Sequence, residues 1–189
     1  MDQETFSLMF AMLALLCWAA IIAIGVGALI RRKSPDAFAS LRYDIGRLGL
    51  VFAWIIALTT TLGSLYYSKV VGYVPCELCW YQRICIYPLS VILGIAAFRR
   101  DVSIRIYAIP LLLVSSGFSI YHSWIQWFPA ETPFCSADVP CNTRYVYEFN
   151  FVSLPFMALS AAILMITLLL AAQNDKTGSD EADDTLASK

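Results

Sequence analysis

Five long apolar runs constrain this chain more than any other feature of its sequence. A helix needs about 20 predominantly apolar residues to cross roughly 30 Å of hydrocarbon. The third run reaches that length only if Trp80 and Tyr81 join it. The predicted spans are Leu8–Ile30, Leu48–Tyr67, Ile84–Phe98, Ile106–Phe128 and Val152–Ala172. We therefore predict an all-α polytopic membrane protein with five transmembrane helices.

The composition excludes a soluble catalytic domain. Hydrophobic residues make up 59% of the 189 residues and charged residues only 14%, which is far from the usual mix of a soluble protein. The predicted helices leave only short loops and one polar tail, so any chemistry must take place at the lipid bilayer. The net charge of −1 gives no reason to expect a nucleic acid partner.

Basic residues predict the orientation of the helices. The first apolar run follows an acidic start and is followed by Arg31, Arg32 and Lys33, so we interpret it as a retained helix rather than a cleaved signal peptide. With its N-terminus outside, ten basic residues fall on the inner side and three on the outer side, as the positive-inside rule requires. The acidic segment 173–189 is then a disordered cytoplasmic tail.

Four of the six cysteines fall in the loops on the predicted outer side. One pair lies between the second and third helices and the other between the fourth and fifth. These residues are Cys76, Cys79, Cys135 and Cys141. The outer side is the side on which disulfides form and persist, in a bacterium or in a secretory lumen. Cys17 and Cys85 fall inside helices, and we interpret both as small packing residues.

The two pairs admit three interpretations. Two structural disulfides are possible, but such short rings contribute only about 2 kcal/mol each, and a helical bundle in lipid hardly needs them. A zinc site is not favoured, because five residues separate the second pair and the chain has one histidine. The CxxC spacing of Cys76 and Cys79 is also typical of redox dithiols, in which a helix N-terminus stabilises a thiolate.

The residues that follow this pair support the redox interpretation. Pro75 and Cys76 stand where the third helix opens, so the positive end of its dipole falls near the sulfurs. Arg83 lies four residues beyond Cys79, on the same helical face. It could be an interfacial residue that extends toward water; we favour a role in stabilising an anion, which is a thiolate, an oxygen of a reduced quinone, or both.

The fourth predicted helix carries a polar stripe that contains the only histidine. Ser115, Ser119, His122 and Gln126 recur at helical spacing, which predicts that they face the interior of the bundle. A buried histidine often has only a packing role. Because His122 lies at about the depth of Arg83, we also expect it to contact a cofactor or a proton path.

These motifs resemble a known family, the bacterial DsbB disulfide bond formation proteins, and among them the short-loop, BdbC-like members. The most specific string runs from Cys76 to Arg83 as CELCWYQR and continues with Tyr87-Pro88-Leu89. Tyr121-His122, the second cysteine pair and Leu154-Pro155-Phe156 join it. The similarity covers roughly residues 43–172 and implies a four-helix transmembrane bundle with redox activity.

The resemblance implies a role for each site residue. Cys79 is expected to contact the quinone ring, and Arg83 to hold a quinone oxygen. Cys135 is expected to form a mixed disulfide with a DsbA-like thioredoxin-fold partner, and Cys141 then exchanges with Cys76. Such a thiol-oxidase and quinone system keeps the bacterial periplasm oxidising. Electrons thus pass from the partner through both pairs to a ubiquinone or menaquinone in the membrane.

The expected organisation has three parts: an additional N-terminal helix in residues 1–33, a four-helix redox domain in 43–172 and the tail 173–189. The family resemblance says nothing about the first helix. For the protein as a whole, the resemblance implies a location in the bacterial inner membrane, with the cysteine loops on the periplasmic side. The second pair is separated by only five residues, so the loop differs from that of the long-loop relatives.

Two other functions compete with this interpretation. Vitamin K epoxide reductase-like proteins also combine loop cysteines with a membrane CxxC, but there the loop pair comes first along the chain, and here the order is reversed. A non-catalytic membrane scaffold or transporter subunit with structural disulfides is the other alternative. It predicts that both pairs stay oxidised, whereas the redox interpretation predicts cysteines that cycle.

Overall fold

The computed structural model contains five long helices, as the apolar runs predicted. It describes residues 3–31, 39–128, 135 and 139–172, so the predicted tail 173–189 lies outside the described residues. The helices are α1 (Gln3–Arg31), α2 (Ala39–Lys69), α3 (Glu77–Arg99), α4 (Arg105–Trp127) and α5 (Leu154–Ala171). Each is long and apolar enough to span a membrane. The prediction of an all-α multi-pass membrane protein is confirmed.

Helices α2 to α5 form a closed four-helix bundle. Contacts join α2 to α3, α3 to α4, α4 to α5 and α5 back to α2. Small and aliphatic side chains from all four helices fill the interior, among them Ala53, Leu89, Leu112 and Met165. Large apolar side chains such as Phe98 remain exposed, which is the arrangement expected of a bundle whose outer surface faces lipid. The predicted four-helix core is thus present.

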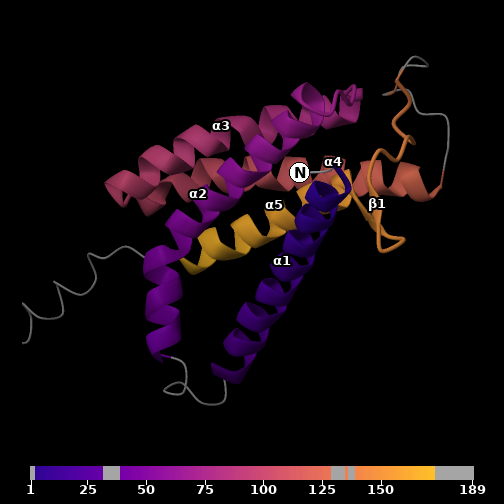
Figure 1. The fold of residues 1–189 in the computed structure, drawn as a ribbon. Coiled ribbons are helices and arrows are strands. Elements are labelled where there is room, and N and C mark those ends of the chain that lie inside the picture. The colour runs from indigo at the N-terminus through magenta and orange to yellow at the C-terminus, as the bar shows by residue number, and fades with distance from the viewer. Residues whose placement is uncertain (1–2, 32–38, 129–134, 136–138, 173–189) are drawn as a thin grey trace, which may run out of the picture.

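Helix α1 lies outside this bundle and packs mainly against α5 (Figure 1). Most of its side chains are exposed, but the face toward the bundle is anchored at two points. The ring of Phe6 stacks on Tyr66, with 3.9 Å between centroids, and the indole N–H of Trp18 donates to Ser160 Oγ at 3.0 Å. The predicted additional helix therefore has specific contacts with the core.

The elements that carry the cysteines meet at one end of the bundle. Helix α2 ends and α3 begins at this end of the bundle. Helix α4 also ends there and α5 begins there, because consecutive helices run in opposite directions (Figure 1). A short hairpin of β1 (Tyr147–Glu148) and β2 (Val152–Ser153) leads into α5. The Tyr145 ring stacks on Tyr73 with 4.5 Å between centroids. This contact ties the second cysteine loop to the first.

Candidate active site

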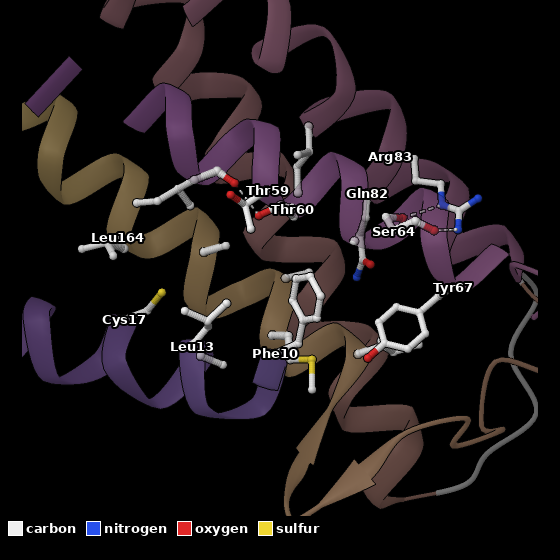
Figure 2. A pocket seen from close by; sticks show the side chains of 18 of the residues that line it. Phe10, Leu13, Cys17, Thr59, Thr60, Ser64, Tyr67, Gln82, Arg83 and Leu164 are labelled. Atoms are coloured by element: carbon white, nitrogen blue, oxygen red, sulfur yellow. Dashed lines mark hydrogen bonds between the residues drawn. The ribbon is translucent and has the colours of Figure 1, made fainter. Parts of the chain in front are cut away.

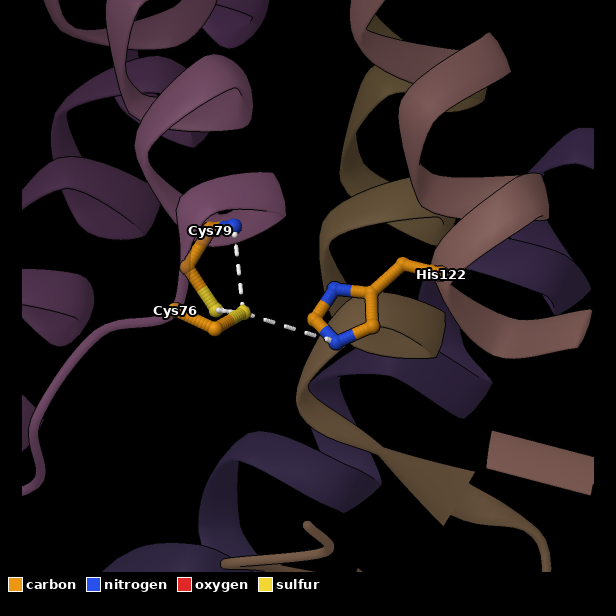
Figure 3. Close-up of side chains that lie close together, drawn as sticks. All are labelled: Cys76, Cys79 and His122. Atoms are coloured by element: carbon orange, nitrogen blue, oxygen red, sulfur yellow. Dashed lines mark hydrogen bonds between the residues drawn. The ribbon is translucent and has the colours of Figure 1, made fainter. Parts of the chain in front are cut away.

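Cys76 is the N-cap of α3, one residue before the helix begins. Its sulfur accepts a hydrogen bond from the backbone N–H of Cys79 at 3.4 Å, as an N-cap side chain normally does. Pro75 therefore precedes the cap and does not occupy the first helical turn. The two sulfurs, both unbonded, lie 2.8 Å apart (Figure 3). A disulfide bond of about 2.05 Å could form between them after a small movement of either side chain.

The second pair forms a disulfide beside the first. Cys135 and Cys141 are bonded, with 5.8 Å between their Cα atoms. Together with Cys76 and Cys79 they belong to one hydrophobic cluster that includes Leu78 and Ile125. Cys141 is buried, whereas Cys135 is partly exposed. Cys135 is therefore the more accessible residue of the loop pair, while Cys141 is buried in the cluster that contains Cys76.

His122 connects the two cysteine pairs. Its Nε2 atom lies 3.8 Å from Cys76 Sγ and 3.1 Å from the carbonyl oxygen of Cys141 (Figure 3). A carbonyl oxygen can only accept, so Nε2 must carry the hydrogen and donate it. The Cys76 sulfur, as a thiolate, can share the same N–H as a second and more distant acceptor. His122 is in contact with the cysteines, and its predicted contact with a quinone stays a prediction.

These contacts change the acidity of Cys76. A hydrogen bond from the Cys79 side chain, and then the hydrogen bond and charge of His122, hold the pKa of Cys76 well below the ordinary value, although burial opposes them. An ordinary thiol has a pKa of about 8.5. The reduced protein therefore carries a thiolate at Cys76 at neutral pH.

We predict that this thiolate persists into mildly acidic solution, because a lowered pKa moves protonation to lower pH. Ultraviolet absorbance of the thiolate in the reduced protein, measured against pH and corrected with Cys76→Ser, gives the midpoint. His122→Ala should raise the midpoint, and Cys79→Ala should raise it further, because Cys79 is the larger cause of the shift. A wild-type midpoint near that of a free thiol would contradict this assignment.

The same side chains could ligate a metal ion. The ligand atoms of Cys76, Cys79 and His122 all lie within 4.8 Å of one another. Two thiolates and one imidazole would suit a thiophilic cation in the reduced state. They are three ligands where a closed structural zinc site has four, so we assign the cluster to thiol chemistry.

Cys79 also lines a cavity of about 380 Å³. Side chains of α1, α2, α3 and α5 line it, most of them apolar (Figure 2). The α3 wall of the cavity is formed by Cys79, Gln82, Arg83, Ile86 and Tyr87. Cys76 and His122 do not belong to the lining residues. The membrane pair thus stands between the loop disulfide and this cavity, with Cys79 on the cavity side.

Arg83 is held in place by α2. Its Nε donates to Ser64 Oγ at 3.0 Å and its Nη2 to the Ser64 carbonyl oxygen at 3.2 Å (Figure 2). The guanidinium also lies over the Trp80 ring, 5.5 Å from its centroid. In the described part of the chain no acidic side chain forms an ion pair with Arg83. A guanidinium has five N–H donors, so it retains capacity for an electron-rich oxygen in the cavity.

Gln82 is a site residue that the sequence analysis missed. Its side chain is buried and points into the cavity in Figure 2. Among the described residues its Nε2 atom has no hydrogen-bond partner, and an unsatisfied buried donor costs about 1–3 kcal/mol. A bound carbonyl oxygen would satisfy it. Only the position of Gln82 beside Arg83 in the CELCWYQR string could have suggested this role.

The polar stripe on α4 faces the interior, as predicted. Ser115, Ser119, His122 and Gln126 are all buried. The hydroxyl oxygens of both serines and Nδ1 of His122 have no partner among the described residues. Cys85 is buried and Cys17 packs against the core, as expected for bystanders, but Cys17 also lines the cavity.

Comparisons with known proteins agree with these observations. A sequence profile of the family described as "Disulfide bond formation protein DsbB" matches residues 46–174. The chain is 41% identical over 130 residues to disulfide bond formation protein C of Bacillus subtilis, which covers 68% of this chain and 94% of that protein. It is 44% identical over 126 residues to a probable disulfide formation protein of Coxiella burnetii, covering 65% and 86%.

A probable disulfide formation protein of Oceanobacillus iheyensis is 46% identical over 127 residues, covering 64% of this chain and 86% of its own. No solved structure matches this chain. The profile match begins after α1, so the additional helix lies outside the part shared with the family.

Proposed function

This chain belongs to the DsbB family of disulfide bond formation proteins, and on that premise we propose that it is a membrane thiol:quinone oxidoreductase. Family membership itself establishes a multi-pass membrane protein with an oxidoreductase role in disulfide formation. The proposal adds the direction of electron flow, the residues that carry it, a thioredoxin-fold dithiol partner and a quinone acceptor.

The first exchange takes place at the loop disulfide. A thiolate of the partner attacks Cys135 Sγ, the bond to Cys141 breaks, and Cys141 leaves as a thiolate. The second thiol of the partner, as a thiolate, then attacks the mixed disulfide, which releases Cys135 and leaves the partner oxidised. The partial exposure of Cys135 and the burial of Cys141 support this order of attack.

The second exchange joins the two pairs. The Cys141 thiolate attacks Cys76 Sγ of an oxidised Cys76–Cys79 disulfide, and Cys79 leaves as a thiolate. Cys135 then attacks Cys141, which restores the loop disulfide and releases Cys76 as a thiolate. The N–H of His122 stabilises that leaving thiolate, because it lies between Cys76 and Cys141. The shared hydrophobic cluster keeps the pairs within reach.

The cavity suits a quinone headgroup by its volume, its apolar lining and its polar end. Gln82 and Arg83 would hold carbonyl oxygens there, and Cys79 stands in the same wall. When bound, a quinone would accept the two electrons that the reduced Cys76–Cys79 pair gives up as it closes its disulfide, and would take two protons from water, because Cys76 and Cys79 are released as thiolates. The apolar lining accepts the ring of a ubiquinone or of a menaquinone.

We further assign the cysteine end of the bundle to the periplasmic side of the bacterial inner membrane. The predicted excess of basic residues at the other end supports this orientation. The proposed organisation keeps three parts: residues 1–33 with the additional helix, the redox domain 43–172 and the cytoplasmic tail 173–189.

One observation carries the proposal: a disulfide, a histidine, a dithiol and a cavity with an arginine follow one another in space. The test is the absorbance of oxidised ubiquinone or menaquinone over time, with the purified protein and a reduced thioredoxin-fold dithiol protein. Turnover that needs both cysteine pairs supports it. If the folded protein reduces neither quinone, it is a membrane protein with structural disulfides.

We predict that Arg83→Ala weakens the apparent affinity for quinone. A hydrogen bond to a charged group contributes about 1.5–3 kcal/mol, so KM for quinone should rise roughly tenfold to hundredfold. The KM for the protein partner should stay the same. Arg144→Ala is the matched control, because Arg144 lies over Tyr147 and does not line the cavity. An unchanged quinone KM in Arg83→Ala would remove this residue from the site.

A further inference from the structure

Helix α1 supplies one wall of the cavity, although it lies outside the segment that matches the family. Five of its residues line the cavity: Phe10, Leu13, Ala14, Leu16 and Cys17. They recur at the spacing of one helical face. Most other side chains of α1 are exposed, so no other described element covers α1 from outside. Without this helix, the cavity would open to the hydrocarbon of the bilayer.

In the contact between α1 and α2, the ring of Phe10 packs against Gly63. A Cβ atom at Gly63 would lie 2.6 Å from Cζ of Phe10, which is closer than real Cβ contacts. The missing side chain at Gly63 therefore provides the space that the Phe10 ring occupies. Phe10 also contacts Tyr67, with 6.1 Å between centroids, and Tyr67 donates to Ser7 Oγ at 3.2 Å.

The α1 wall runs from the polar end of the cavity into its apolar part. In Figure 2, Phe10 lies on the side of Gln82 and Tyr67, toward Arg83, whereas Cys17 lies at the opposite end beside Leu164. Phe10 lines the same cavity as the unpartnered amide of Gln82, and its aromatic ring offers an apolar surface to a planar ring. The residues beyond it offer an apolar surface to an isoprenoid chain.

We propose that α1 is part of the quinone site, with Phe10 in contact with the headgroup and Leu13 with the chain attached to it. This inference rests on the proposed function and extends it to residues outside the family core. The additional helix then contributes to quinone affinity in this protein and does more than anchor the chain in the membrane.

The test measures binding directly, by the quenching of tryptophan fluorescence when decylubiquinone is added to the purified full chain. Phe10→Ala should raise Kd about tenfold, because it removes the burial of an aromatic surface. Leu13→Ala should weaken binding less. Leu8→Ala is the matched control, because Leu8 is on the same helix, 45% exposed and absent from the lining; its Kd should equal that of the wild type.

A second readout does not depend on variants. An azido derivative of ubiquinone, photolysed on the wild-type protein, should label a peptide that contains Phe10 or Leu13 in addition to peptides of α3. Wild-type Kd in Phe10→Ala and Leu13→Ala, with label confined to α2, α3 and α5, would overturn the inference. The proposed function would then still stand if Arg83→Ala weakens binding. If the wild-type protein binds no quinone, both fail.

Discussion

Replacing Cys79 by serine is expected to lower quinone reduction below about one thousandth of the wild-type rate, as the loss of a covalent nucleophile does in other enzymes. Cys79 is the cysteine of the membrane pair that lines the cavity. Without it, the Cys76–Cys79 disulfide cannot close, so the membrane pair cannot deliver two electrons to the quinone. The loop disulfide of Cys135 and Cys141 remains intact in this variant.

The measurement has two parts. Quinone absorbance follows turnover with a reduced thioredoxin-fold protein, and non-reducing electrophoresis follows the covalent complex with a partner that lacks its second active-site cysteine. Cys79→Ser should form this complex at Cys135 at the wild-type level. Cys85→Ser, a buried cysteine of the same helix, should behave as wild type in both assays. Quinone turnover by Cys79→Ser would refute the proposed role of Cys79.

Replacing Cys135 by serine is expected to lower turnover as much, because it prevents the reaction with the protein partner rather than the reaction with quinone. The loop then has no disulfide for a partner thiolate to attack, so no covalent complex forms and turnover with the partner falls below about one thousandth. The cavity is untouched, because Cys135 is not among its lining residues. The Kd for decylubiquinone, measured by tryptophan fluorescence, should therefore remain that of the wild type.

The two variants separate the reaction with the protein partner from the reaction with quinone. Cys79→Ser should trap the partner without reducing quinone, whereas Cys135→Ser should bind quinone without trapping the partner. If Cys135→Ser still formed the covalent complex, the partner would be attacking another cysteine. If it lost quinone affinity as well, the loop disulfide would have to hold the cavity in shape.

Much of the architecture could be predicted from local sequence. The apolar runs predicted five helices, because the thickness of the bilayer sets their length. The burial of the α4 stripe followed from its helical spacing. Helix boundaries were less predictable: α3 begins at Glu77, because Cys76 caps it, and the polar residues around the cysteines do not look like part of an apolar run.

The amino-acid sequence by itself determined which residues can do chemistry and which helix each one belongs to, because composition and spacing are local properties. Only the tertiary structure decided which of them meet. Cys76 and Cys141 share one cluster through His122, and Phe10 fills the space left by Gly63. The physical reason is that such contacts depend on how whole helices pack, and the spacing of residues along one helix contains no information about its neighbours.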